Sequence, residues 1–297
     1  NFPKLSSTAM TAIQPLFTEL EPMPKALADA PIGIFDSGIG GMSVAAEIAK
    51  YLPNERIVYY ADTAYVPYGP RSDEEIRELT ARAVDWLYRQ GCKIAVVACN
   101  TASAFSLDHL REHYGEHFPI VGLVPALKPA VLQTRSKVVA VLATPATFRG
   151  QLIKDVVEKF AVPAGVKVMT LTSLELVPCV EAGQQMSPVC LNALREVLQP
   201  AVEQGADYLV LGCTHYPFLN EAIRHLFDNQ FTLVDSGLAV ARQTARILIK
   251  NELLCDQIRQ NIARIECYVS GNNADALQPV LQNMIPQELT WTLHNLS

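Results

Sequence analysis

Short apolar runs alternate with amphipathic stretches along this chain from residue 31 onward. Most of these runs are rich in Val, Ile, Leu and Ala without polar alternation, which is typical of strands buried on both faces of a sheet. They cover residues 32–35, 56–61, 93–98, 120–123, 137–143, 166–171, 208–211 and 231–234. Their alternation with helical stretches predicts an α/β fold built from doubly wound lobes with mainly parallel sheets.

Local capping patterns mark where several helices begin. Ser72 and Glu75 form a capping box, and the apolar residues that follow at helical spacing predict a helix that ends before Gly91. Further helices are predicted to begin at Thr144-Pro145, at Ser187-Pro188 and at Pro217.

The C-terminal residues 264–297 have a different pattern. A short strand at 265–269, a helix through Leu277 and Met284, and a second strand at 289–293 follow one another there. These elements predict a small appended unit or an edge hairpin.

A chain of 297 residues is long enough for about two domains. No linker rich in Gly or Ser separates two halves, so we expect the chain to cross between two lobes more than once, with its C-terminal part returning to the first lobe. Residues 1–30 hold four prolines and no clear periodicity, which predicts an N-terminal extension. Because the chain begins at Asn1 without a Met, a targeting segment could be missing from it.

Charge and apolar content argue against several classes of function. The formal net charge is −6 and no basic stretch occurs, which makes nucleic acid a poor candidate partner. No apolar run approaches the roughly 18 residues of a membrane span, and the first 30 residues do not have the pattern of a secretory signal.

The seven cysteines stand at positions 92, 99, 179, 190, 213, 255 and 267. Their number is odd and they form no C-x-x-C pair, which favours free thiols in a reducing cytoplasm over a disulfide framework.

Two of these cysteines end apolar strands in matching settings. Cys99 is followed by Asn100 and Thr101, and Cys213 by Thr214 and His215. Ligands in open α/β folds bind beyond the carboxyl ends of the strands, and a following helix N-terminus lowers the pKa of a thiol. The two thiols are therefore candidate catalytic groups. An Asp-Ser-Gly triplet also occurs twice, at residues 36–38 and 235–237.

Two simpler interpretations compete with this one. A cysteine after an apolar run is most often a packing residue, and we assign the other five cysteines to packing or to the surface. Cys99, Cys213 and His215 could instead bind zinc, but the spacing of Cys213 and His215 is tighter than usual and the sequence offers no fourth ligand nearby.

The glycine-rich turn at residues 38–43 raises a third alternative, a dinucleotide site. It follows a strand and opens a helix, and Asp62 ends the next strand. Ser43 replaces the third small residue of that fingerprint, and Asp36 would put a carboxylate beside the pyrophosphate. Both departures count against a nucleotide.

Two thiols that face each other across a cleft suit removal of a proton from one face of a carbon and its return to the other face. One thiol acts as base and the other as acid, and the roles exchange with direction. No Lys stands in a setting that suggests a pyridoxal Schiff base, so hydrogen bonds and desolvation would have to acidify the α-proton.

The chain resembles the cofactor-independent glutamate racemases of the aspartate/glutamate racemase superfamily, from about Ile32 to Leu253. The resemblance rests on Phe35-Asp-Ser-Gly-Ile-Gly-Gly41, Val66-Pro-Tyr-Gly69, Ala98-Cys-Asn-Thr-Ala-Ser103, Gly212-Cys-Thr-His-Tyr-Pro217 and Val234-Asp-Ser-Gly237. The His after the second Cys-Thr favours the glutamate branch, because aspartate-type relatives tend to carry an acidic residue there.

The resemblance implies a role for each matching residue. Cys99 and Cys213 would be the acid/base thiols that interconvert L- and D-glutamate, with Asp36 supporting Cys99 and His215 supporting Cys213. Glu181 matches an additional carboxylate of the catalytic site. The positions that match substrate-binding residues are Asp36, Ser37, Tyr68, Gly69, Asn100, Thr101, Thr214 and His215.

The resemblance also implies an architecture and a cellular role. A second lobe of residues 127–235 would be inserted into a first lobe of residues 31–126 and 236–297, with the active site between them. Family members need no pyridoxal phosphate or metal, often dimerise, and supply D-glutamate for peptidoglycan, and hence for cell wall and cell shape, in the cytoplasm.

Two further properties occur in only some members of the family. Some that carry an N-terminal extension are activated by UDP-N-acetylmuramoyl-L-alanine, and some bind and inhibit DNA gyrase. The sequence carries no motif that bears on either property. A dinucleotide-dependent oxidoreductase and a non-catalytic two-lobed amino-acid-binding protein remain the alternative functions.

Overall fold

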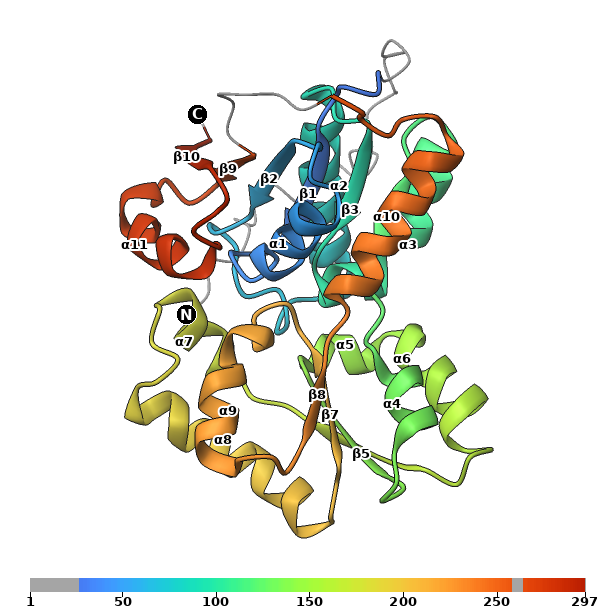
Figure 1. The fold of residues 1–297 in the computed structure, drawn as a ribbon, viewed down its shortest axis with the longest axis vertical. Coiled ribbons are helices and arrows are strands. Elements are labelled where there is room, and N and C mark those ends of the chain that lie inside the picture. The colour runs from blue at the N-terminus through green and yellow to red at the C-terminus, as the bar shows by residue number, and fades with distance from the viewer. Residues whose placement is uncertain (1–26, 258–263, 297) are drawn as a thin grey trace.

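The computed structural model describes residues 27–257 and 264–296, and it contains two parallel sheets (Figure 1). The predicted N-terminal extension falls almost wholly on residues 1–26, outside the described residues. The predicted fold class, α/β with parallel sheets, is confirmed. Among the residues that the structure describes, no helix is long and apolar enough to cross a membrane.

The first sheet has six strands in the order β10-β9-β2-β1-β3-β4, and every neighbouring pair is parallel. The strands are β1 (Ile32–Asp36), β2 (Ile57–Ala61), β3 (Ile94–Val97), β4 (Ile120–Gly122), β9 (Ile265–Val269) and β10 (Trp291–Asn295). The central strands β1 and β3 are buried along their whole length, as their continuous apolar runs predict. The surrounding helices are α1 (Met42–Tyr51), α2 (Asp73–Arg89), α3 (Asn100–Tyr114), α10 (Gly237–Lys250) and α11 (Ala274–Met284).

The second sheet has four parallel strands in the order β6-β5-β7-β8. They are β5 (Val138–Ala143), β6 (Lys167–Leu171), β7 (Tyr208–Gly212) and β8 (Thr232–Val234). The helices of this part are α4 (Leu127–Gln133), α5 (Pro145–Arg149), α6 (Gln151–Val156) with a π-helical turn at Val157–Ala161, α7 (Leu176–Glu181), α8 (Pro188–Glu203) and α9 (Asn220–Phe227).

The predicted caps are present. The Ser72 hydroxyl accepts a hydrogen bond from the Glu75 backbone N–H, the Glu75 side chain bonds back to the Ser72 backbone, and α2 runs from residue 73 to 89. The Thr144 hydroxyl caps α5 and the Ser187 hydroxyl caps α8, each by accepting one backbone N–H hydrogen bond from the residue three positions later. The helix predicted at Pro217 differs, because the chain first forms a 3₁₀ turn at Tyr216–Leu219 and continues as α9 only from Asn220.

The predicted edge hairpin at the C-terminus is wrong. β9 and β10 are parallel, and α11 connects them, so residues 264–296 form a βαβ unit whose strand β9 pairs with β2. Parallel strands need a crossover connection of a dozen or more residues, and the helix between these two strands supplies it. The unit therefore extends the first sheet at its edge (Figure 1).

The chain passes between the sheets twice, after β4 and after β8. The two crossings are joined where the Ser236 hydroxyl donates to the Val124 carbonyl at 2.7 Å. The division into lobes at residues 126 and 235 stays a prediction, because the membership of a strand in a sheet does not define a folding unit.

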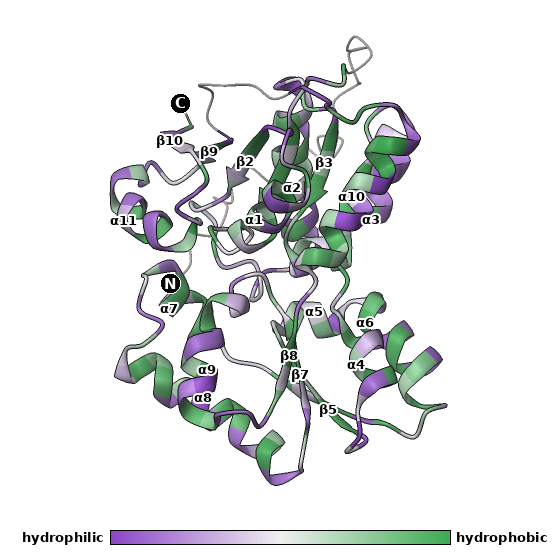
Figure 2. Cartoon of the chain, in the orientation of Figure 1, coloured by the Kyte–Doolittle hydropathy of each residue, from purple (hydrophilic) through white to green (hydrophobic). Residues whose placement is uncertain are grey.

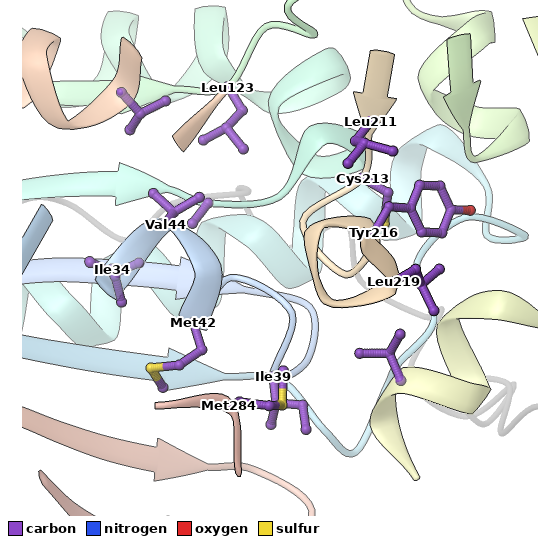
Figure 3. Close-up of a cluster of buried hydrophobic side chains, with 14 of the residues drawn as sticks. Ile34, Ile39, Met42, Val44, Leu123, Leu211, Cys213, Tyr216, Leu219 and Met284 are labelled. Atoms are coloured by element: carbon purple, nitrogen blue, oxygen red, sulfur yellow. The ribbon is translucent and has the colours of Figure 1, made fainter. Parts of the chain in front are cut away.

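One apolar cluster contains residues of both sheets and of the helices around them. It contains Ile34 of β1 and Met42 of α1 from the first part, and Leu211 of β7 and Tyr216 of the 3₁₀ turn after β7 from the second (Figure 3). Strand β3, whose four residues are all apolar, has the green of hydrophobic residues in Figure 2. The residues around the first sheet and those around the second sheet thus belong to one continuous apolar core.

Candidate active site

The two candidate thiols lie at the carboxyl ends of strands from different sheets and line one cavity. Cys99 follows β3, Cys213 follows β7, and both residues line this cavity. The cavity is lined by Ser37, Pro67, Tyr68, Gly69, Cys99, Asn100, Thr101, Thr144, Val177, Cys213, Thr214 and His215. All seven cysteines of the chain are free and buried, but only these two line this cavity.

Cys99 is the N-cap of α3. Its sulfur accepts a hydrogen bond from the Ala102 backbone N–H at 3.4 Å and donates to the Ser37 hydroxyl at 3.6 Å. Burial raises the pKa of Cys99 far above its usual range, the negative charge of Asp36 raises it further, and the Ala102 N–H only partly offsets both. The helix N-terminus lowers this pKa, as the sequence predicted, but burial outweighs it, so Cys99 rests as a protonated thiol.

Cys213 begins a chain of contacts that reaches the first sheet. Its sulfur lies 3.5 Å from Nδ1 of His215, and Nε2 of His215 lies 2.6 Å from Oε1 of Glu181. The same Glu181 oxygen accepts a hydrogen bond from the Ile39 backbone N–H at 2.8 Å. Glu181 ends α7, so this carboxylate joins the α7 side of the cleft to the glycine-rich turn after β1.

The contacts of His215 determine its charge. Burial lowers the pKa of His215, but its hydrogen bonds with Cys213 and Glu181 and the charges of those two groups raise it, with the net result well above its usual range. His215 therefore holds a proton between the Cys213 sulfur and the Glu181 carboxylate. The surroundings of the two thiols are thus unlike, with a cation beside Cys213 and an anion near Cys99.

Asp36 lies behind the cavity wall and is fully buried. Its Oδ2 accepts hydrogen bonds from the Gly41 backbone N–H at 2.6 Å and from the Thr214 hydroxyl at 3.4 Å, while Oδ1 has no protein partner. Burial raises the pKa of Asp36 to about 6, against the lowering effect of the charge on His215. The hydrogen bonds of Asp36 run to Gly41 and Thr214, so its predicted support of Cys99 would act through charge.

Most residues predicted to bind substrate are brought together here. Ser37, Tyr68, Gly69, Asn100, Thr101, Thr214 and His215 all line the cavity, whereas Asp36 and Glu181 lie behind it. Oδ1 of Asn100 is buried and has no protein hydrogen-bond partner. These residues offer hydroxyl and amide groups to a polar ligand, and their individual roles stay predictions.

Thr144 is a cavity residue that the sequence reasoning did not assign to the site. Its hydroxyl lies 2.8 Å from the hydroxyl of Thr101, which joins the ends of β5 and β3. A Cβ on Gly69 would lie 3.1 Å from the Cβ of Thr144, so the two loops are in close contact. The rule that ligands bind at strand ends could have identified Thr144, because it directly follows β5.

The glycine-rich turn serves close packing against the catalytic candidates. A Cβ on Gly40 would overlap the imidazole of His215, and one on Gly38 would overlap the carboxylate of Glu181. A Cβ on Gly41 would lie 2.7 Å from the Cβ of Asp36. The space that a dinucleotide pyrophosphate would need beside this turn is filled by protein side chains, which counts against the dinucleotide alternative.

In residues 27–257 and 264–296, no group of three or more His, Cys, Asp or Glu side chains is arranged to hold a metal ion.

Comparison with known proteins identifies the family. Residues 33–244 match the model of the Asp/Glu/Hydantoin racemase family. The chain belongs to this family. It is 60% identical over 234 residues to a glutamate racemase of Deinococcus radiodurans, covering 79% of each chain, and 42% identical over 261 residues to one of Ectopseudomonas mendocina, covering 88% of this chain and 97% of the relative. The resemblance to glutamate racemases and the predicted enzyme class, an isomerase, are confirmed.

Solved structures agree with this assignment. The Escherichia coli glutamate racemase, solved with L-glutamate and the activator UDP-MurNAc-Ala, superposes with a TM-score of 0.75 at 37% identity and covers 90% of this chain and 98% of its own. The Francisella tularensis enzyme, solved with D-glutamate, has a TM-score of 0.76 at 28% identity and covers 91% of this chain and 98% of its own. The fold of the chain is that of these racemases.

The packing of Gly40 against His215 gives a first prediction. Gly40→Ala is expected to lower racemase kcat/KM by about 100-fold, because the new methyl group must displace the imidazole from Cys213. Steady-state racemisation measured by circular dichroism checks this. Gly205→Ala is the comparison variant, because a Cβ at residue 205 would meet no atom within 4 Å. The variant should lose some stability, because the φ of Gly205 is +72°, a conformation that alanine rarely adopts. Equal activity of the two variants would contradict the packing argument.

Proposed function

We propose that this racemase interconverts L- and D-glutamate by proton transfer at the α-carbon between Cys99 and Cys213. The observation that carries the proposal is that these two thiols come from different sheets, line the same cavity and have oppositely charged neighbours. The relatives named as glutamate racemases and the two solved with the enantiomers of glutamate support the substrate.

In the proposed reaction, one thiol starts as thiolate and the other as thiol. The thiolate takes the α-proton, the electron pair stays on the substrate as a carbanion or enolate, and the opposite thiol gives its proton to the other face. Cys213, paired with protonated His215, is suited to begin as the thiolate, and Cys99, whose pKa is raised by burial, begins as the acid. The reverse direction starts from the opposite pair of protonation states.

No lysine or arginine lines the cavity among the described residues, so the two substrate carboxylates would be bound by uncharged donors. The side chains of Asn100, Thr101 and Thr214, with the backbone N–H groups at the start of α3, supply such donors. We propose that these hydrogen bonds and the exclusion of water acidify the α-proton without pyridoxal phosphate or metal.

The cellular part of the proposal follows the family. We propose that the protein acts in the cytoplasm, as a homodimer or in a monomer–dimer equilibrium, and supplies D-glutamate for peptidoglycan. The E. coli relative was solved with an activator, UDP-MurNAc-Ala, so this wall precursor is the activator to test.

The test is incubation of the purified protein with L-glutamate and, separately, D-glutamate in deuterated buffer with chelator and no cofactor, with and without the precursor. Loss of optical rotation with deuterium in the product is expected from both enantiomers. Racemisation seen only in the samples that contain the precursor would show that this protein requires the precursor as an activator. If folded, reduced protein binds glutamate but never racemises it, the proposal is contradicted and the amino-acid-binding alternative is supported. If the protein acts on glutamate only when a nicotinamide dinucleotide is added, the oxidoreductase alternative is supported.

The ionisation of Asp36 predicts the acid side of the pH profile. Ionised Asp36 stabilises the cation on His215, so kcat/KM is expected to fall about tenfold per pH unit below pH 6, the pKa of Asp36. Because this pKa is raised from an unfolded value near 4, stability from this group is fully present below about pH 4 and is lost as the pH rises to 6. Acidification thus protonates Asp36 without destabilising the fold through it.

Rate profiles and urea unfolding measured over the same pH range separate these two effects. Asp36→Asn should lower activity and remove this acid limb. A wild-type kcat/KM that is constant from pH 5 to 7 would contradict the assignment.

A further inference from the structure

A buried carboxylate outside the cavity connects a cavity residue to the C-terminal unit. The Tyr68 hydroxyl donates a hydrogen bond to Oδ2 of Asp62 at 2.6 Å, and both side chains are buried. Tyr68 lines the site beside Gly69, on the loop that follows β2. Asp62 itself does not line the cavity, and the proposed reaction does not use it.

The second oxygen of Asp62 is bound from the far end of the chain. The Ser270 hydroxyl, directly after β9, donates to Oδ1 of Asp62 at 2.6 Å and accepts from the Ala64 backbone N–H at 3.1 Å. The Ser270 backbone N–H also donates to the Ala61 carbonyl at 3.1 Å. Both carboxylate oxygens therefore accept short hydrogen bonds from hydroxyls, one on the loop after β2 and one directly after β9.

Two more hydrogen bonds connect the loop after β2 to the turn after β9. The Thr63 hydroxyl donates to Oδ1 of Asn273 at 2.9 Å, and the Gly271 backbone N–H donates to the Thr63 hydroxyl at 3.0 Å. The loop that carries Tyr68 is thus attached to the turn between β9 and α11 at successive points. This turn belongs to the βαβ unit at the edge of the first sheet.

We propose that Asp62 and Ser270 are positioning residues that hold Tyr68 and its loop in the geometry that binds substrate, so that the C-terminal βαβ unit forms part of the substrate-binding apparatus. The proposal rests on the proposed racemase function. A carboxylate is costly to bury unless its oxygens are hydrogen-bonded, and hydrogen bonds to a charged acceptor are stronger than neutral ones. The hydroxyls of Tyr68 and Ser270 are therefore strongly held in the positions where they donate hydrogen bonds to the Asp62 carboxylate.

This role replaces the one that a dinucleotide site would give to Asp62. Its two oxygens are occupied by Tyr68 and Ser270. The aromatic ring of Tyr68 also contacts Phe35 of β1, with 6.1 Å between ring centroids. Together these contacts attach the Tyr68 side chain to β1, to the end of β2 and to the C-terminal unit.

The test uses Asp62→Asn, Ser270→Ala and Tyr68→Phe in the full-length protein. Each is expected to raise KM for both enantiomers of glutamate about tenfold and to change kcat by less than about threefold, because the reacting thiols stay in place. The Tyr68→Phe/Ser270→Ala double variant should cost less than the product of the single effects, since both act through Asp62. Hydrogen exchange of the backbone amides of residues 62–71 should become faster in Ser270→Ala, although residue 270 lies about 200 positions away.

The control variant is Thr80→Val, which removes a buried hydroxyl that donates to the Ile76 carbonyl at 2.6 Å inside α2. It should lower Tm without changing KM or the exchange of residues 62–71. Wild-type KM and wild-type exchange in Asp62→Asn and Ser270→Ala would overturn the positioning role, as would a KM change in Thr80→Val of the same size. If the wild type does not racemise glutamate, the proposed function fails, and the exchange measurement still decides whether Ser270 anchors the loop.

Discussion

Cys99→Ala and Cys213→Ala are each expected to lower the turnover of glutamate racemisation by about 1,000-fold or more. Each variant removes a group that must take or give the α-proton, and a positioned acid or base contributes roughly 10²–10⁴-fold to such a step. Circular dichroism of L- and D-glutamate solutions measures the loss. Glutamate binding, followed by calorimetry, should change little, because neither thiol is needed to bind the carboxylates.

The control for this experiment is Cys190→Ala. Cys190 is a fully buried free cysteine in α8 and does not line the cavity. This variant should lose some stability and keep its racemase activity. Wild-type turnover in Cys99→Ala or in Cys213→Ala would refute the two-thiol reaction.

Residual chemistry in the single variants gives a sharper test. Each thiol addresses one face of the α-carbon, so a variant with one thiol can remove a proton from only one enantiomer and return it to the same face. In deuterated buffer, any slow α-exchange in Cys99→Ala should be confined to one enantiomer, and in Cys213→Ala to the other. Exchange of the same enantiomer by both variants would show that the thiols do not flank the substrate.

Local sequence patterns predicted the fold class and the position of the candidate site for identifiable reasons. Continuous apolar runs are typical of strands buried on both faces, and β1, β3 and β7 lie where such runs occur. One residue separates the end of β3 from Cys99, and Cys213 immediately follows β7. The rule that ligands bind at strand ends therefore predicted a site at both thiols, and both line one cavity.

What the sequence could not predict depends on contacts between distant residues. Ser270, one of the two side-chain partners of Asp62, stands 208 positions later, and no local pattern relates the two residues. Pairing of β9 with β2 is likewise a long-range contact. The hairpin alternative for residues 264–297 was wrong for a different reason, because the helix between β9 and β10 makes their pairing parallel. The raised pKa of Cys99 also depends on burial, which is a property of the folded chain.

A second large effect is expected far from the cavity. Lys93 precedes β3, is fully buried, and its Nζ donates to Oε2 of Glu55 at 2.6 Å and to the carbonyls of Ala28 and Leu253 at 2.6 and 2.8 Å. Oε1 of Glu55 accepts from the Cys255 backbone N–H at 2.9 Å. The ion pair therefore connects the segment before β1, the turn before β2 and the segment after α10.

Lys93→Met is expected to lower the free energy of unfolding by about 3–5 kcal/mol, because it leaves the Glu55 carboxylate buried without its cation. Urea denaturation measures this. Lys93→Met/Glu55→Gln should recover more than half of the loss, since it removes the unpaired charge and keeps an acceptor for Cys255. Lys159→Met breaks the exposed pair with Asp155 and should leave the urea midpoint close to that of the wild type. Equal losses in Lys93→Met and Lys159→Met would mean that water enters the Glu55 site and screens its charge.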